Sequence, residues 1–300
     1  MSIAIRAAII KLLLRTFALF PLPVVHAIGA ALGWLMAITP NDVRRVSRIN
    51  IDMCFPQLTP SRRRRLLVQS LVESGKTALE FAPLWFWSED KILALIKAAP
   101  GRQRLDDLLN KGKGVILLIP HLGAWELASI YVSMCFAEKY PVTGLYRPPR
   151  MGALDMMIRR ARERFGARMV PTTMTGVRTL YHTLNKGGVV GVLPDQEPGT
   201  GNPLFAPFFG VPANTMGLVS KLMTRTRAEA VYVYFTRLSG GRGFEVHFLP
   251  ASPGLDDKDL HIATQRLNEG VEVCIRQYPE QYQWGYKRFR TRPPGEAGVY

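Results

Sequence analysis

A short apolar run that ends in proline and histidine constrains the fold of this chain most. Residues 115–119 are all apolar and rich in β-branched types, and Pro120 follows directly. Such a run is typical of a strand buried on both faces, as in parallel sheets that helices cover. His121 comes next, and Glu126 lies five positions further along. The stretch therefore predicts a polar site immediately after a buried strand.

The spacing of His121 and Glu126 limits how the two side chains can meet. On one regular helix, residues five apart point ~140° away from each other, because each residue turns ~100°. They can meet only if His121 lies in a strand-to-helix turn and Glu126 reaches back from the first helical turn. An imidazole whose tautomer a carboxylate fixes is the arrangement of a general base. The alternative is a helix-capping turn that contains a histidine by chance.

Strand and helix patterns alternate along most of the chain. Residues 41–98 are predicted to be helical, and no linker rich in Pro, Gly or Ser divides residues 41–290. The predicted strands are 115–119, 142–146, 168–170, 189–193, 230–238 and 244–249, and the predicted helices between and after them are 123–136, 152–166, 174–185, 215–226 and 258–277. This alternation predicts an α/β domain with a mostly parallel central sheet flanked by helices. The last two strands are predicted to form an antiparallel hairpin.

Two segments of the chain share one pattern. Each has Leu-Asn-Lys-Gly, then an apolar strand, then a proline, and the polar residue that follows is His121 in one and Asp195 in the other. Both residues are therefore expected at the carboxyl ends of strands, where open parallel sheets hold their active sites. Arg147 directly follows the strand 142–146 and is expected at the same edge.

The amino-terminal segment is a candidate membrane anchor. Residues 17–39 are almost wholly apolar, and a helix of that length would span a bilayer core of ~30 Å. Pro21 and Pro23 interrupt the helix, and basic residues on both sides favour the cytoplasm for both flanks. We therefore expect residues 1–40 to form a kinked anchor in the inner leaflet, ahead of one domain of residues 41–300. A single span, a cleaved signal peptide and a buried core helix are the alternatives.

The charge of the chain points to acidic partners. Lys and Arg outnumber Asp and Glu by 39 to 23, for a net charge of +16. The four arginines at 62–65 lie close to the anchor, where they could bind anionic lipid or an acidic carrier, or simply form a solvated helix face. No nucleic-acid-binding motif accompanies the charge, so nucleic acid is not an expected partner.

Several chemistries have no support in the sequence. There is neither a phosphate-binding Gly-x-x-x-x-Gly-Lys-Ser/Thr loop nor a Gly-x-Ser-x-Gly nucleophile elbow. The three cysteines are far apart and odd in number, which fits no disulfide framework and favours a reducing compartment. No histidine pair has metal-ligand spacing. We therefore expect no metal and no cofactor.

The stretch from His121 to Glu126 resembles the His-x4-Asp/Glu motif of the lysophospholipid-type acyltransferases. The resemblance is to the lauroyl and myristoyl branch of late acyltransferases, which acylate lipid A precursors. Further blocks occur in the family's order along most of the chain. They are residues 48–56, 146–148, 191–196, 208–215 and 278–289.

The resemblance implies an O-acyltransferase of the cell inner membrane, with its catalytic domain on the cytoplasmic side among the membrane phospholipids. It would transfer a fatty acyl chain from a thioester of acyl carrier protein, or less often coenzyme A, to a hydroxyl of a glycolipid acceptor. His121 would remove the proton of that hydroxyl, and Glu126 would orient the imidazole. The freed oxygen would attack the thioester directly, without a covalent enzyme intermediate.

Five further residues are predicted to bind substrate. Arg147 and Arg150 are suited to a phosphate or carboxylate of the acceptor, because guanidinium groups pair with such anions. Asp195 is expected to form an ion pair with Arg147, to position the acceptor or to play a turn role. Gln196 is expected to hydrogen-bond the loop, and Trp125 to flank the groove.

The sequence does not define which glycolipid hydroxyl is acylated. Many lipid A family members carry an asparagine a few residues beyond the Arg-Pro pair, whereas this chain has Pro-Arg-Met-Gly at residues 149–152. The acylated hydroxyl, and even the glycolipid, can therefore differ; a phosphatidylinositol mannoside is one alternative. A non-enzymatic basic membrane protein is another. The apolar residues 205–211 suit either the lining of an acyl tunnel or core packing.

Overall fold

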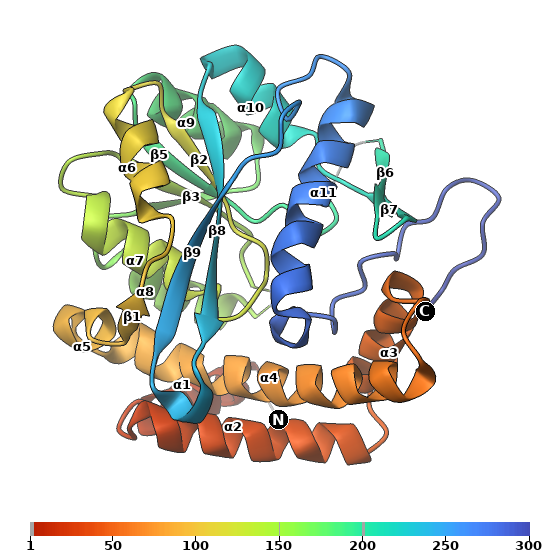
Figure 1. The fold of residues 1–300 in the computed structure, drawn as a ribbon. Helices are drawn as coiled ribbons and strands as arrows, with labels where there is room; N and C mark the ends of the chain where they lie inside the picture. The colour runs from red at the N-terminus through yellow and green to blue at the C-terminus, as the bar shows by residue number, and fades with distance from the viewer. Residues whose placement is uncertain (1–2, 150, 200–201) are drawn as a thin grey trace.

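A seven-stranded sheet forms the centre of the molecule (Figure 1). The computed structural model describes residues 3–149, 151–199 and 202–300. The strand order is β1-β9-β8-β2-β5-β3-β4, and only the β8–β9 pair is antiparallel. The bounds are β1 Ile96–Ala98, β2 Val115–Leu118, β3 Val142–Tyr146, β4 Arg168–Pro171, β5 Val189–Val192, β8 Glu229–Arg237 and β9 Phe244–Pro250. The predicted mostly parallel sheet and its antiparallel hairpin are confirmed.

The strand β2 is buried on both faces, as its composition predicts. Its four side chains are at most 1% exposed. Ile116 and Leu118 belong to one hydrophobic cluster, while Val115 and Leu117 belong to another on the opposite face. Side chains of successive strand residues point to opposite faces, so an uninterrupted apolar run is what this central position requires.

Helices cover both faces of the sheet. Apolar residues of α6 (Arg102–Asn110), α7 (Leu127–Phe136) and α8 (Asp155–Glu163) lie in the cluster that contains Val115. Those of α9 (Met174–Asn185), α10 (Leu218–Thr226) and α11 (Leu260–Gln277) lie in the cluster that contains Ile116. The predicted helices are thus confirmed, with two corrections. Residues 96–98, predicted to be helical, form the strand β1 instead, because they pair with β9 at the edge of the sheet. The helix predicted from residue 123 begins only at Leu127, because Leu122 and Gly123 form bridges to Tyr282 and Phe235.

Residues 205–211 contribute three buried side chains to the core. They contribute to a small antiparallel pair, β6 (Phe205–Phe208) and β7 (Val211–Asn214). Phe208 and Phe209 are buried in the main hydrophobic cluster. Of the two alternatives for this segment, the structure supports core packing over the lining of a tunnel.

The amino-terminal part is helical, as α1 (Ile3–Phe17), α2 (Leu22–Ile38), α3 (Asp42–Cys54), α4 (Pro60–Phe86) and the short α5 (Glu89–Leu93). Thr59 caps α4, and the helix continues past Gly75 and Pro83. The two helices α2 and α4 run side by side (Figure 1). Their backbones are in contact, since a Cβ atom added to Gly75 would lie 2.1 Å from the carbonyl oxygen of Gly29. Glycine is therefore required at this crossing.

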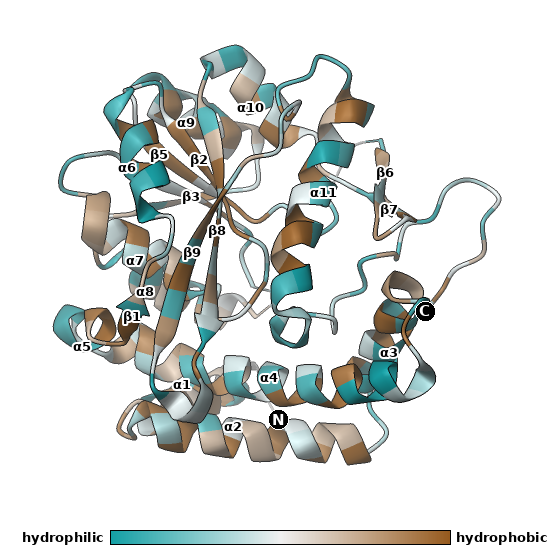
Figure 2. Cartoon of the chain, viewed as in Figure 1, coloured by the Kyte–Doolittle hydropathy of each residue, from teal (hydrophilic) through white to brown (hydrophobic). Residues whose placement is uncertain are grey.

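The outer face of α2 is apolar (Figure 2). Large side chains that α2 exposes are Val24, Ile28, Leu32, Trp34, Leu35 and Ile38. Within the described ranges, no single helix has the length and hydropathy to cross a membrane, although α2 and α3, bent by 78°, meet the criterion as a pair. The kinked anchor of residues 1–40 stays a prediction.

Candidate active site

The loop between β2 and α7 carries the histidine motif. Gly123 adopts φ +61°, and a Cβ atom there would lie 1.7 Å from the carbonyl oxygen of Phe235, so only glycine fits. The N–H of Gly123 donates to the carbonyl of Gln281 and that of Ala124 to the carbonyl of Phe235. Neighbouring segments therefore fix the loop through its backbone.

His121 is held by Asp195. Asp195 Oδ1 lies 2.8 Å from His121 Nδ1, and its Oδ2 accepts the backbone N–H of His121 at 2.9 Å. The contact arises because β5, which precedes Asp195, pairs in parallel with β2. Burial opposes ionisation of Asp195, but the charge and hydrogen bonds of His121 outweigh it and lower the pKa of this carboxyl. An ionised Asp195 accepts a hydrogen bond from Nδ1–H, so that in the neutral imidazole Nε2 carries the lone pair.

Gln196 meets the other nitrogen of the ring. Its amide Nε2 lies 3.1 Å from His121 Nε2 and 3.3 Å from the side-chain oxygen of Gln283. The amide is therefore a donor to Nε2, in agreement with the tautomer that Asp195 sets. The backbone N–H of Gln283 also donates to the carbonyl of His121 at 3.1 Å. Gln283 was not among the predicted site residues, although it lies in the family block 278–289.

Glu126 makes its hydrogen bonds to other partners in this structure, so its predicted role of orienting the imidazole stays a prediction. Glu126 is 2% exposed, and its carboxylate accepts two hydrogen bonds from Arg162, at 2.7 and 2.6 Å, and one from the Trp85 indole at 2.8 Å. Within the described residues, no hydrogen bond joins Glu126 to His121. The reason is that Asp195 already occupies Nδ1, while the planar guanidinium of Arg162 matches both oxygens of Glu126.

Arg162 and Trp85 are functional candidates that sequence reasoning missed. Arg162 lies on α8, where its charge fits an ordinary amphipathic helix, and Trp85 lies near the end of α4. Burial disfavours the charged guanidinium, yet Glu126 more than compensates and raises the pKa of Arg162. Neither position carries a local signal, because each contact joins segments far apart in the chain.

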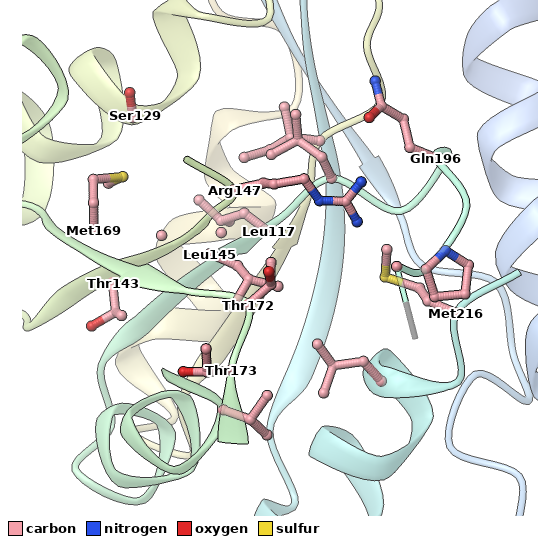
Figure 3. A pocket seen from close by; sticks show the side chains of 18 of the residues that line it. Leu117, Ser129, Thr143, Leu145, Arg147, Met169, Thr172, Thr173, Gln196 and Met216 are labelled. Carbon is pink, nitrogen blue, oxygen red and sulfur yellow. The ribbon is translucent and has the colours of Figure 1, made fainter. Parts of the chain in front are cut away.

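A cavity of about 1540 Å³ opens beside the His121 ring. It is also lined by Trp125, Glu126, Arg147 and Gln196, so the structure brings these predicted residues to one site. In Figure 3, Gln196 and Arg147 lie to one side of the pocket and Met169 and Ser129 to the other. Apolar side chains line much of the wall: Leu117, Ile119, Val132, Val142, Leu145, Met169 and Leu193.

The remaining predicted residues have clear positions, with one exception. Trp125 packs against the His121 ring, with ring centroids 4.8 Å apart. Arg147 is exposed at the cavity, and among the described residues no ion pair joins it to Asp195, so that alternative is wrong. Arg150 lies outside the described residues.

Comparison with known proteins relates the chain to one bacterial family. The family model for bacterial lipid A biosynthesis acyltransferases matches residues 3–291 of this chain. The chain is 28% identical to the lipid A biosynthesis lauroyltransferase of Escherichia coli K12 over 283 residues, which are 93% of this chain and 90% of the relative. It is 27% identical to the palmitoleoyltransferase of that strain over 284 residues (93% and 89%) and 24% to its myristoyltransferase over 271 residues (90% and 82%).

An α/β fold with a histidine–aspartate pair at a largely apolar cavity, together with these relatives, defines an acyltransferase. The chain belongs to the bacterial lipid A biosynthesis acyltransferase family. The resemblance found in the sequence is thereby confirmed, and the non-enzymatic alternative is set aside.

Proposed function

We propose that this protein transfers a fatty acyl chain from a thioester of acyl carrier protein to a hydroxyl of a lipid A precursor. Family membership supports a lipid A acceptor. The observation that carries the mechanism is the bond between His121 and Asp195 at the cavity wall. The donor is inferred from the basic charge of the chain, which suits an acidic carrier.

His121 acts as the general base in this proposal. Nε2 takes the proton of the acceptor hydroxyl while the hydroxyl oxygen attacks the thioester carbon. Asp195 stabilises the imidazolium that forms. The tetrahedral intermediate then expels the thiolate, which takes the proton from Nε2 to become the free thiol, and the ester is released. No bond to the enzyme forms, because the acceptor oxygen is itself the nucleophile.

Gln196 changes its partner in this mechanism. Its amide meets Nε2 in the free protein, so the acceptor hydroxyl has to take its place. The displaced amide then lies next to the reacting carbon and can donate a hydrogen bond to the oxyanion. Glu126 fixes Arg162 and the loop beside Trp125, and so shapes the wall of the cavity.

The apolar part of the cavity is proposed to hold the acyl chain. Ser129 lies on the side away from Gln196 (Figure 3). Ser129→Phe should therefore shift the preference towards shorter acyl thioesters, by about fourfold in kcat/KM for each excluded methylene, or ~0.8 kcal/mol. Competition between thioesters of several lengths measures this, with Ser129→Ala as the control. If Ser129→Phe kept the wild-type preference for acyl-chain length, the acyl chain would have to bind in another part of the protein.

Arg147 is proposed to bind an anionic group of the acceptor, because it is exposed at the cavity. Arg147→Ala should raise KM for the glycolipid about 10- to 100-fold, the worth of a hydrogen bond to a charged group. KM for the acyl donor should stay the same. Arg147→Lys keeps the charge but loses the paired N–H donors of the guanidinium, so its KM for the glycolipid should be intermediate. Equal changes in both KM values would contradict this role.

The protein is proposed to lie on the cytoplasmic face of the inner membrane. The support is the apolar outer face of α2 and a basic pocket of about 400 Å³ between α3 and α4. Arg44, Arg48, Arg63 and Arg64 line this pocket. An apolar face beside a basic patch is typical of binding to a surface of anionic phospholipids.

Vesicle binding tests this placement. Arg48→Gln together with Arg64→Gln should weaken binding to anionic vesicles about 30-fold at low salt, from ~1 kcal/mol per arginine. Binding to neutral vesicles should not change, and Arg104→Gln on α6, remote from α3 in Figure 1, serves as control. Equal loss on both vesicle types would argue against an electrostatic contact.

Mass spectrometry of lipid A from cells that lack the protein tests the proposed function. Loss of one secondary acyl chain is the expected result. An unchanged acyl pattern would contradict a lipid A acceptor, and loss of acyl groups from another glycolipid, such as a phosphatidylinositol mannoside, would redirect the assignment.

A further inference from the structure

A buried ion pair lies beneath the histidine loop. Glu80 of α4 is fully buried, and Arg237 at the end of β8 is 7% exposed. Two guanidinium nitrogens of Arg237 donate to the two carboxylate oxygens of Glu80, the Nε bond being 2.7 Å long. Burial opposes the charge on Glu80, but Arg237 and His26 outweigh it and lower the pKa of Glu80 to about 2. The pair is therefore charged at neutral pH.

Arg237 also holds the loop that carries His121. Its Nη2 donates to the carbonyl oxygen of Gly123 at 3.0 Å. Gly123 lies between His121 and Glu126 in the chain. The backbone of Arg237 exchanges hydrogen bonds with the side chain of Gln281, whose own carbonyl accepts the N–H of Gly123. Arg237 thus fixes the middle of the loop from two sides.

The amino-terminal helix α2 completes this network. His26 of α2 is 4% exposed, and its Nε2 lies 3.1 Å from Glu80 Oε2. His26 is the histidine of a segment that the sequence predicts to be an anchor. Contacts therefore run without a break from α2 through Glu80 and Arg237 to the carbonyl of Gly123.

Stability alone is a weak reason for such an arrangement. A buried ion pair is often no more stabilising than apolar residues of the same volume, because both charges lose their hydration. What this pair adds is a directed donor to a loop carbonyl next to the catalytic histidine. Small displacements of a catalytic group can cost about 10²-fold in rate.

We propose that His26, Glu80 and Arg237 are positioning residues for His121, and that the seating of α2 on α4 sets the geometry of the catalytic loop. This inference rests on the proposed role of His121 as the base. It gives α2 a part in turnover that is separate from any part in membrane attachment.

Variants of α2 in the full-length protein test the inference. His26→Leu removes the bond to Glu80 and should lower kcat about tenfold, or ~1.4 kcal/mol, while KM for the acyl thioester stays the same. His26→Gln, whose amide can still donate to Glu80, should recover most of the rate. The matched control is Val25→Ala, which opens a cavity at a fully buried neighbour. It should lower the melting temperature but reduce kcat much less than His26→Leu does.

A second variant probes the other end of the network. Arg237→Lys keeps the charge, loses the fork and should lower kcat about 10²-fold. In the Arg237→Lys background, His26→Leu should lower kcat by a smaller factor than it does in the wild type, because residues of one network are coupled. If Arg237→Lys does not fold, the two His26 variants decide the matter.

Two results would separate failure of this inference from failure of the proposed function. Wild-type kcat in His26→Leu, or a loss no greater than that of Val25→Ala, would overturn the positioning role while His121→Ala stays inactive. Full activity in His121→Ala would overturn the proposed base itself, and the positioning role with it.

Discussion

Replacing His121 with alanine should lower kcat about 10²- to 10⁴-fold, the usual contribution of a general base. His121 lies at the cavity wall and its side chain is 9% exposed, so the fold should survive. His121→Gln should be equally slow but more stable, because its amide can still donate to Asp195, whereas alanine removes that side-chain donor from the buried carboxylate.

Initial rates with an acyl carrier protein thioester and a lipid A precursor measure this effect, together with thermal melting. The control is His182→Ala on α9, an exposed histidine that does not line the cavity. More than a tenth of the wild-type rate in folded His121→Ala would contradict a base at this position.

Asp195→Asn should lower kcat by up to about 10⁴-fold, as loss of the orienting aspartate does in a serine protease triad. The asparagine amide can donate to Nδ1 and so favours the tautomer whose Nε2 carries the proton and cannot act as a base. Glu126→Gln should cost less, because Glu126 bonds to Arg162 and Trp85 rather than to the imidazole. The opposite order of losses would restore a direct partnership between His121 and Glu126.

The stability of Asp195→Asn gives a second readout with a defined sign. The pKa of Asp195 is lowered in the folded protein. Its carboxylate therefore stabilises the fold above the unfolded value of ~3.9, and this contribution disappears as pH falls through the lower folded value. Wild type should thus be more stable than Asp195→Asn at neutral pH, and the difference should shrink below pH ~4. A difference that grows in acid would contradict the ionised state of Asp195.

The sequence predicts that both His121 and Asp195 follow strand ends, but it pairs His121 with Glu126, whereas the structure shows a hydrogen bond to Asp195. The repeated strand-proline-polar pattern located His121 and Asp195 at strand ends, and both are found there. Their contact depends on β5 lying next to β2, and strand order is not a property of either segment. Glu126 is near His121 in sequence. However, the bridges of Leu122 and Gly123 shift the start of the helix to Leu127, and Glu126 then hydrogen-bonds to Arg162.

The amino-terminal helices also show that contacts between distant segments cannot be predicted from local sequence. Composition predicts an apolar segment broken near Pro21, and α2 does begin at Leu22. Hydropathy does not distinguish a face that packs on protein from a face that meets lipid, and α2 has one buried and one exposed apolar face. The contact of Gly29 with Gly75 and the bond of His26 to Glu80 join residues far apart in sequence, so no local pattern predicts them.

A reaction of the purified protein with defined substrates tests the central claim most directly. The acceptor is a lipid A precursor with free hydroxyls on its 3-hydroxyacyl chains, and the donors are matched thioesters of acyl carrier protein and coenzyme A. Mass spectrometry should show one added acyl chain on such a hydroxyl, faster from the carrier protein, with no acylated enzyme. An intact glycolipid with both donors, or an acyl group bound to the protein, would contradict direct transfer by His121 and Asp195.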